Sequence, residues 1–320
     1  MNPLVSIITP CFNGEKYLDR YFNSLLNQDY DECQLIFMDD GSSDNTRLIV
    51  EEYIGLLENK GFSVEYHYND NHGQAFAVGE GIKYIKGKYY IWPDADDILT
   101  HNSISKRVEF LEKHNDYAVV RSECKVVYED DLQTEVERSA QKNGNRFVEN
   151  LYHNCLTMTA FYFQPGCYMA RTEALLKINP NRYIYESRAG QNIQMLLPIL
   201  YYSKCGYIDE PLYVYVRSKS SHSNSLGCDF ESKIKRLDSF IDVYEMTIKN
   251  TLIREKKESI KENKSAILKR KIDLSFQAKK KSEAKKYYAQ LRRIGSASAK
   301  DYLKTVLCGN ALFEKVLITC

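Results

Sequence analysis

The chain has 320 residues, 43% hydrophobic and 27% charged, with a net charge of +1, so it is ordinary globular material, long enough for one large domain or a domain with an appendage. Its nine cysteines include no Cys-x-x-Cys pair, which argues against a zinc site, a thiol redox motif or a disulfide framework. No apolar run approaches the about 18 residues of a membrane span, and a strand pattern starts almost at once, so we expect no signal peptide and a cytoplasmic location.

Acidic and basic residues are unevenly distributed along the chain. Residues 1–230 contain 22 Lys and Arg against 32 Asp and Glu, a net charge of −10, whereas residues 231–320 contain 22 against 11, a net charge of +11. From about Cys228 the sequence becomes Lys-rich and helical in pattern. An acidic front and a basic tail indicate two units with different tasks, which we place at residues 1–225 and 226–320.

The first hundred residues alternate between strand-like and helix-like patterns. Short β-branched and aromatic runs predict buried strands, and apolar residues at helical spacing predict helices with one buried face. We expect strands at Leu4–Thr9, Gln34–Met38, Phe62–Tyr68 and Tyr89–Trp92, and helices at Gly14–Gln28, after a cap at Ser43 or Asp44, and at Gln74–Ile85. This alternation predicts an α/β fold, a parallel sheet with helices on both faces.

The middle of the chain, residues 103–225, is less regular. Its patterns predict a helix at Ser103–His114, a strand at Tyr117–Tyr128, and a second α/β portion that ends at Pro211–Arg217. The tail that follows is predicted to be an α-helical region.

Polar motifs follow three of the predicted strands. Pro10–Asn13 follows the first strand, Asp39–Asp44 the second, and Asp94–Asp97 the fourth. Ligands of open parallel sheets bind beyond the carboxyl ends of the strands. The three motifs therefore predict a single site along one edge of the sheet.

Three carboxylates lie within the four residues Asp94–Asp97, directly after a buried strand. Asp94 and Asp96 are two residues apart, so in extended backbone their side chains lie on the same face. Paired carboxylates suit a hard divalent cation, Mg²⁺ or Mn²⁺, that also binds phosphate. The alternative is an acidic loop in which Asp97 caps the next helix.

In their order and spacing, these motifs resemble those of the family 2 glycosyltransferases, nucleotide-sugar-dependent enzymes with a GT-A fold. The resemblance covers about residues 3–225 and rests on four segments: Val5–Asn13, Met38–Asp44, Gly73–Gly81 with Lys83, and Asp94–Asp97. It implies an inverting, metal-dependent enzyme that moves a sugar from a nucleoside diphosphate donor, UDP in our interpretation, to a hydroxyl group. The implied acceptor is a bacterial-type surface polysaccharide or a lipid-linked glycan.

The resemblance assigns roles on the donor side of the site. Phe12 offers a flat apolar face for stacking of a pyrimidine base, although a core position is the alternative. Pro10 holds the loop in a fixed geometry, and Asp40 matches the position that accepts a hydrogen bond from the base imide, although turn capping is the alternative. Asp96 matches the direct metal ligand of the family, and Asp94 a ligand of the metal or the ribose.

The expected catalytic base is missing from its usual place. Relatives open a helix with Glu-Asp after the acceptor loop, whereas this chain has Gln191-Asn192 there, and an amide accepts no proton at neutral pH. Either the base lies elsewhere, or the alignment is different, or this branch uses another arrangement. We nominate the nearby Glu186 as base, with an ion pair to Arg188 or Arg182 as its alternative role, and Gln191 and Asn192 as acceptor-binding amides.

A basic, Ser-rich segment, Tyr215–Ser223, ends the front unit. Relatives often close such a segment over the diphosphate. His222 is then a candidate metal ligand, and Arg217 or Lys219 a candidate phosphate ligand, with plain surface residues as the alternative.

The basic tail has two interpretations. Its helices either pack on the front domain as a lid or dimer contact, or lie on the anionic inner face of the plasma membrane as a peripheral contact, which we favour. The apolar residues that would face that membrane are Leu291, Ile294, Leu303, Val306, Leu307, Phe313, Val316 and Leu317. Nucleic-acid binding is disfavoured, because aromatic platforms do not interleave with the charge.

Other classes of protein fit the sequence less well. No G-x-G-x-x-G or Walker A motif follows the first strand, which argues against a dinucleotide dehydrogenase and a P-loop NTPase. A nucleotidyltransferase should carry a Gly-rich basic loop there. A non-catalytic nucleotide-sugar-binding protein with the same fold is the main rival, motivated by Gln191-Asn192.

Overall fold

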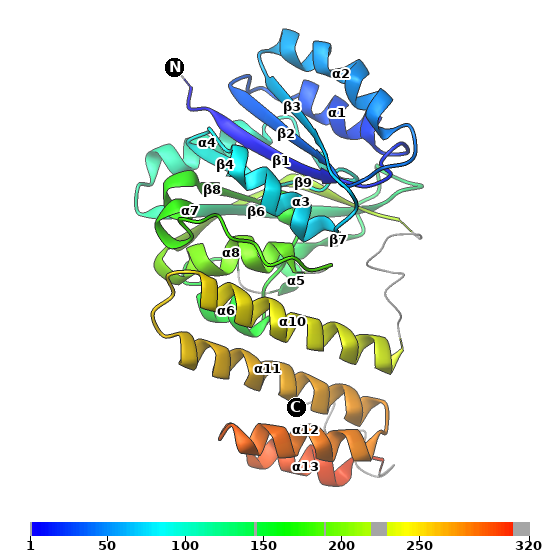
Figure 1. Ribbon diagram of the computed structural model, residues 1–320, viewed down its shortest axis with the longest axis vertical. Helices are drawn as coiled ribbons and strands as arrows, with labels where there is room; N and C mark the ends of the chain where they lie inside the picture. The colour runs from blue at the N-terminus through cyan, green and yellow to red at the C-terminus, as the bar shows by residue number, and fades with distance from the viewer. Residues whose placement is uncertain (1, 144–145, 189, 219–228, 310–320) are drawn as a thin grey trace.

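The computed structural model describes residues 2–143, 146–188, 190–218 and 229–309 (Figure 1). The strands are β1 (Val5–Cys11), β2 (Cys33–Asp39), β3 (Ser63–Tyr68), β4 (Tyr89–Ile91), β5 (Ile98–Leu99), β6 (Tyr117–Tyr128), β7 (Glu137–Arg138), β8 (Tyr168–Arg171) and β9 (Lys204–Arg217). The helices of the front unit are α1 (Leu18–Leu26), α2 (Thr46–Lys60), α3 (Gln74–Gly81), α4 (Ser103–Lys113), α5 (Ser139–Asn143), α6 (Tyr152–Thr157), α7 (Thr172–Ile178) and α8 (Gln191–Tyr202). The tail contributes α10 (Phe230–Asn250), α11 (Lys256–Gln277), α12 (Lys281–Arg293) and α13 (Ala299–Leu307).

The strands of the described chain form one sheet in the order β3-β2-β1-β4-β8-β6-β9-β5, with β7 paired to β6. The pairs β1–β2, β2–β3, β1–β4 and β6–β9 are parallel, while β8 runs antiparallel to both of its neighbours and β5 to β9. The mostly parallel sheet predicted from the alternation of strands and helices is therefore confirmed.

The path of the first four strands reverses direction beside β1. From β1 the chain moves outward through α1 and α2 to β3, and then returns through α3 to β4 on the other side of β1. Because β-α-β crossovers are right-handed, this reversal places α3 on the opposite face of the sheet from α1 and α2. The carboxyl ends of β1 and β4 flank the point of reversal, where such sheets bind ligands.

Local contacts explain where elements begin later or end earlier than expected. The helix expected from Gly14 begins at Leu18, because the backbone N–H groups of Asn13 and Gly14 donate to Ser42 Oγ and Thr46 Oγ1, at 2.9 and 2.7 Å. These bonds tie the loop after β1 to the loop after β2. The helix expected over Gln74–Ile85 is α3 followed by a 3₁₀ turn, Ile82–Tyr84.

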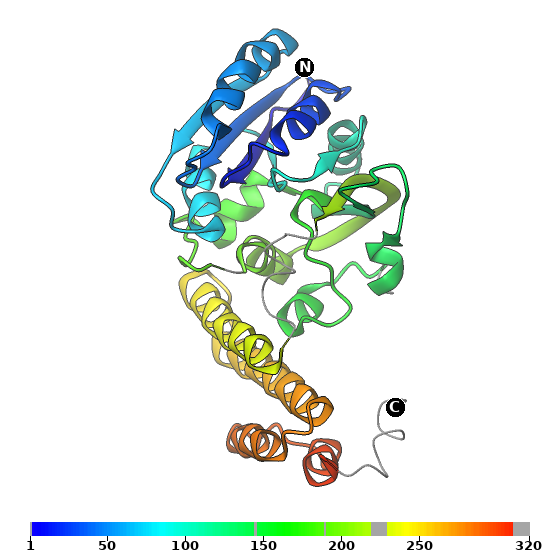
Figure 2. The ribbon, with the colours of Figure 1, turned by 90° about the vertical axis from the view of Figure 1, so that its right-hand side faces the viewer.

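The tail helices continue the fold away from the sheet (Figure 2). Helix α10 packs on α8, and α11 packs on α6 and α10. Val243, Tyr244 and Ile248 of α10 belong to the main hydrophobic core, so the tail is anchored in the front unit. A second core joins α10, α11 and α12, and consists of Ile234, Leu268, Ile272, Tyr287 and Leu291.

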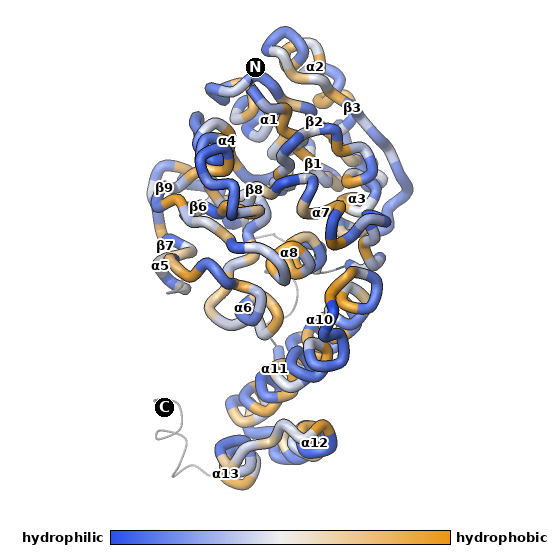
Figure 3. The backbone as a smooth tube through the Cα atoms, turned by 90° about the vertical axis from the view of Figure 1, so that its left-hand side faces the viewer, coloured by the Kyte–Doolittle hydropathy of each residue, from blue (hydrophilic) through white to orange (hydrophobic). Residues whose placement is uncertain are grey.

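Helices α10–α13 show hydrophilic and hydrophobic positions side by side (Figure 3). Within the described residues, no helix combines the length and the hydropathy that crossing a bilayer requires. The last helix, α13, packs on α11 and α12 at the end of the molecule farthest from α2 (Figures 2 and 3).

Candidate functional site

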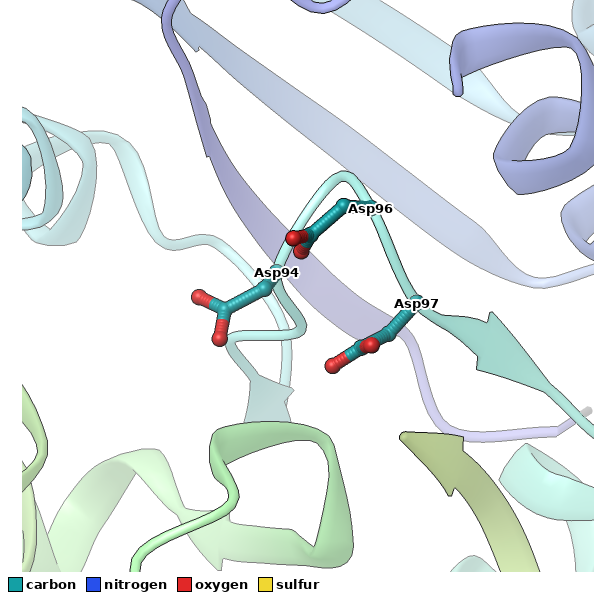
Figure 4. A group of neighbouring side chains, drawn as sticks. All are labelled: Asp94, Asp96 and Asp97. Atoms are coloured by element: carbon teal, nitrogen blue, oxygen red, sulfur yellow. The ribbon is translucent and has the colours of Figure 1, made fainter. Parts of the chain in front are cut away.

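Three carboxylates meet on the turn that follows β4. One oxygen from each of Asp94, Asp96 and Asp97 lies within 4.8 Å of the others, and the three side chains project from the same turn (Figure 4). The backbone here is a turn rather than the extended strand we expected, with Asp97 N–H donating to the Asp94 carbonyl at 3.3 Å. The carboxylates lie close together as expected, but a turn and not an extended strand brings them there.

Two helices hold this turn in place. The Gln74 side-chain amide, at the start of α3, donates to Asp94 Oδ1. Arg20 of α1 donates through Nε and through a second guanidinium nitrogen to the backbone carbonyl of Asp96, the first at 3.2 Å. Sequence reasoning missed both residues, because nothing in the local pattern links positions so far apart in the chain.

Asp97 has a structural role rather than the helix-capping role considered above. Its buried carboxylate accepts hydrogen bonds from the Tyr213 hydroxyl and, at 2.8 Å, from the Val216 backbone N–H, both in β9. Helix α4 begins only at Ser103. Asp97 therefore ties the acidic turn to the last strand of the front unit.

The electrostatics of the turn favour a bound cation. Burial, with the charge of Asp96 second, raises the pKa of Asp94 to about 8. Burial also raises the pKa of Asp97 well above its usual range, with further contributions from Asp96 and Asp94. Crowded carboxylates at a partly buried site repel one another, and a divalent cation relieves this repulsion.

An exposed aromatic ring stands at the end of β1. Phe12 is 45% exposed, whereas the neighbouring Cys11 is buried. Pro10 lies in β1 beyond Ile7, where pairing with β4 ends, so its missing N–H interrupts no bond to β4. Phe12 is therefore not a core residue, which was the alternative. Its ring is accessible to a planar ligand.

The two acidic residues at the end of β2, Asp39 and Asp40, are buried and hydrogen-bonded. Asp40 accepts hydrogen bonds from the backbone N–H groups of His72 and Gly73, at 2.9 and 2.8 Å. Asp39 accepts from Ser42 N–H and from the Tyr66 hydroxyl, at 2.8 and 2.7 Å. Asp40 thus fixes the loop before α3, and its contact to a base stays a prediction.

The proposed base faces this same loop. Glu186 Oε1 lies 2.9 Å from Nδ1 of His72, and Arg188 packs against Gly73. Glu186 does not use the alternative partner Arg182, which donates to the backbone carbonyls of Ile82 and Lys83. Sequence spacing gives no signal of this pair, because the two residues lie more than one hundred positions apart.

The two amides at the start of α8 differ in their contacts. Asn192 Oδ1 accepts a hydrogen bond from Trp92 Nε1 at 3.0 Å, and Asn192 Nδ2 donates to the Phe163 carbonyl at 2.8 Å. These contacts join α8 to the end of β4 and give Asn192 a packing role. Gln191 lies beside it at the helix start, partly exposed.

At the end of β9, Arg217 forms an ion pair with Glu137 at 3.2 Å, and its backbone carbonyl accepts from Glu129 N–H. The ion pair between Arg217 and Glu137 joins β9 to β7. A contact between Arg217 and phosphate stays a prediction. His222 and Lys219 lie outside the described residues.

A mostly parallel sheet with a carboxylate turn at its point of reversal defines an α/β protein with the fold of nucleotide-sugar transferases. The model of the family described as "Glycosyl transferase family 2" matches residues 6–178, more than half of the chain. The chain belongs to glycosyl transferase family 2, and the resemblance seen in its motifs is confirmed.

Relatives in this family share moderate identity over part of their length. An uncharacterized glycosyltransferase of Haemophilus influenzae is 31% identical over 163 residues, 51% of this chain and 49% of the relative. A putative teichuronic acid biosynthesis glycosyltransferase of Bacillus subtilis, TuaG, is 33% identical over 109 residues, 34% of this chain and 42% of the relative. The chain thus spans less than half the length of each.

Solved structures share the fold. The S. aureus protein TarS 1–349, in complex with UDP-GlcNAc, matches with a TM-score of 0.64 at 18% identity, over 98% of this chain and 92% of that one. The mannosyltransferase PcManGT of Pyrobaculum calidifontis, in complex with GDP-Man and Mn²⁺, matches with a TM-score of 0.60 at 14% identity, over 98% and 81%. The GT-A fold is confirmed.

Proposed function

We propose that the protein is an inverting, metal-dependent glycosyltransferase that moves a sugar from UDP to a hydroxyl of a surface polysaccharide or lipid-linked glycan. The observation that carries the proposal is the convergence at one sheet edge of Asp94 and Asp96 with the exposed ring of Phe12. Family membership supports the transfer of a sugar. The UDP-GlcNAc bound to TarS and the teichuronic acid named for TuaG support the choice of donor and acceptor.

The acidic turn fits a divalent cation, Mn²⁺ or Mg²⁺. Asp94 and Asp96 would hold it, with His222 as a further candidate ligand, because Asp97 is engaged by β9. When bound, the ion neutralises charge on the leaving nucleoside diphosphate. Gln74 orients the Asp94 carboxylate, and Arg20 holds the backbone of the turn at Asp96.

The remaining donor contacts come from the loops after β1 and β2. Phe12 stacks on the uracil ring, and such stacking contributes about 1–3 kcal/mol per base. Pro10 limits the motion of that loop. Asp40 accepts from the uracil imide with a lone pair left over from its two backbone bonds, and Arg217 approaches the diphosphate from β9.

The acceptor is deprotonated by Glu186 in this proposal. As the acceptor oxygen attacks the anomeric carbon and the bond to the diphosphate breaks, the hydroxyl proton passes to a Glu186 carboxylate oxygen. His72 is a positioning residue, because its ring holds Glu186 at 2.9 Å and is itself packed on Phe76, with ring centroids 4.5 Å apart. Gln191 binds the acceptor beside it, and Asn192 keeps the helix start in place.

A second candidate function is binding of a nucleotide sugar without catalysis. The observation that favours it is the pair of amides, Gln191 and Asn192, where a carboxylate is expected. Under this alternative the acidic turn still binds the donor with a cation, and only turnover is missing.

Release of UDP from several UDP-sugars in the presence of Mn²⁺ separates the two functions. We expect slow donor hydrolysis by the native chain and none by Asp96→Ala, which also loses Mn²⁺-supported UDP binding. The matched control is Asp116→Ala, which removes an exposed carboxylate paired with Lys204 outside the site. Binding without any turnover supports the second function, and undiminished turnover by Asp96→Ala contradicts the first.

Acceptors of this kind are built at membranes, and we include in the proposal a peripheral contact with an anionic bilayer through the basic tail. The net charge of +11 over residues 231–320 supports it.

A further inference from the structure

Helix α13 leaves a stripe of apolar side chains exposed, although it also buries polar ones. Asp301 and Thr305 are buried, and Leu307 and Cys308 pack in a small apolar cluster with Phe276 and Ala284. The opposite stripe has Tyr302, Leu303 and Val306, which are 53%, 49% and 41% exposed. A surface helix of a globular protein normally buries its apolar stripe, so this orientation calls for a partner.

Contacts on the polar face fix this orientation. Ser298 and Asp301 form a capping box at the start of α13, with Ser298 N–H donating to Asp301 Oδ2 at 2.9 Å. Lys304 forms an ion pair with Asp273 of α11. The capping box lies within α13 and would turn with the helix. The contacts to α11 would not: rotation of α13 to bury its apolar stripe would break the Lys304–Asp273 ion pair and the bond from Cys308 Sγ to the Ser275 carbonyl, at 3.5 Å.

The surroundings of the stripe are cationic. Residues 281–309, which span α12 and α13, contain seven Lys and Arg against two Asp and Glu. Two of these cations are paired with acids, Lys286 with Glu283 and Lys304 with Asp273 of α11. The remaining acid, Asp301, is buried in the cap. Arg292 and Arg293, at the end of α12, are exposed.

Charge decides between the possible occupants. A second copy of the chain would bring another cationic tip against the first, which like charges oppose. An anionic lipid surface fits both the apolar stripe and its cationic surroundings. Apolar and aromatic side chains enter the headgroup boundary, while Lys and Arg contact lipid phosphates. The helix also lies at the end of the molecule away from α1–α3, so docking there leaves the acidic turn open (Figures 2 and 3).

We infer that Tyr302, Leu303 and Val306 of α13, flanked by the cationic end of α12, form a docking surface for an anionic membrane. This inference names the residues of the membrane contact in the proposed function and is independent of catalysis. It also revises the expected apolar set, because Leu291 is buried in the second core and only part of the predicted face is exposed.

Flotation with vesicles tests the surface on the full chain. We expect binding to vesicles of phosphatidylcholine with about one-third phosphatidylglycerol, little binding to pure phosphatidylcholine, and loss of binding at high salt. The variant Leu303→Glu/Val306→Glu should lower binding at least about tenfold. The matched control is Leu48→Glu/Leu56→Glu, which makes the same change at two exposed leucines of α2, at the opposite end, and should bind as the native chain does.

Three results would overturn the inference: no binding of the native chain to anionic vesicles, an equal loss in the α2 control, or unchanged binding by the α13 variant. A dimer of the native chain by light scattering that the α13 variant dissolves would assign the stripe to a second copy instead. A thermal melt confirms that each variant is folded. Release of UDP without lipid should be the same in the native chain and the α13 variant, so failure of the proposed catalysis leaves this test intact.

Discussion

The two sides of the candidate site use different kinds of residue for different tasks. On the side of β1 and β4, there are an exposed ring and a partly buried pair of carboxylates on a turn that side chains of α1 and α3 hold in place. On the side of α8, the residues that open the helix are amides, and Asn192 is engaged by Trp92 and Phe163. The difference indicates that donor binding follows the family pattern while proton removal, in our proposal, has moved to Glu186.

Replacing Glu186 tests the acceptor side most severely. General base catalysis contributes about 10²–10⁴-fold, so Glu186→Gln should reduce kcat for transfer by about that factor while leaving the KM for the donor nearly unchanged. His72→Gln, which keeps a polar group near the carboxylate, should cause a smaller loss and alter the pH profile of kcat. Steady-state kinetics across pH measure both, and a fully active Glu186→Gln enzyme would place the base elsewhere.

The acidic turn should make stability depend on pH in the metal-free protein. Because the pKa of Asp94 is raised to about 8, the folded state binds more protons than the unfolded state between about pH 4 and about pH 8. Stability should therefore fall as pH rises through this range, by up to about 1.4 kcal/mol per pH unit. Denaturant titrations at several pH values measure the slope.

The matched variant for this slope is Asp94→Asn, which removes the titrating group and keeps the shape. It should flatten the pH dependence, and Mn²⁺ should stabilise the native chain more at high pH than at low pH. The same slope in Asp94→Asn would show that other groups cause it.

Replacing Phe12 tests how the donor base is bound. If its ring stacks on the base, Phe12→Ala should weaken UDP binding by about 1–3 kcal/mol, which is about 5- to 150-fold, with little change in kcat. Phe12→Tyr retains a ring and should bind nearly as the native chain does. Calorimetric titration with UDP and Mn²⁺ measures the effect, and an unchanged affinity in the alanine variant would assign the base to another surface.

The smallest effect on sugar transfer is expected at α8. Asn192→Asp restores a carboxylate at the position where relatives carry one, but it removes the donor to the Phe163 carbonyl. We expect a loss of about 1–3 kcal/mol in the free energy of unfolding and no gain in the rate of transfer. A clear gain in rate would show that the native chain lacks only a carboxylate at position 192. That result would favour the non-catalytic function for the native chain.

Much of the fold is readable from the sequence because its signals are local. The strand Tyr117–Tyr128 and the start of α4 at Ser103 lie where periodicity placed them, since each buried face repeats at the spacing of its own secondary structure. The start of α1 was predicted too early. Bonds from Asn13 and Gly14 to the loop after β2 decide it, and those partners lie about thirty residues away.

By itself the sequence determined the parallel sheet, the acidic cluster after β4 and the family, because each rests on residue types at short, regular spacing. Only the tertiary structure paired His72 with Glu186, bound Asp97 to β9, and turned the apolar stripe of α13 outward. These arrangements join residues distant in sequence, or depend on which face of a helix meets its neighbours. No local pattern carries that information, because it is fixed by packing.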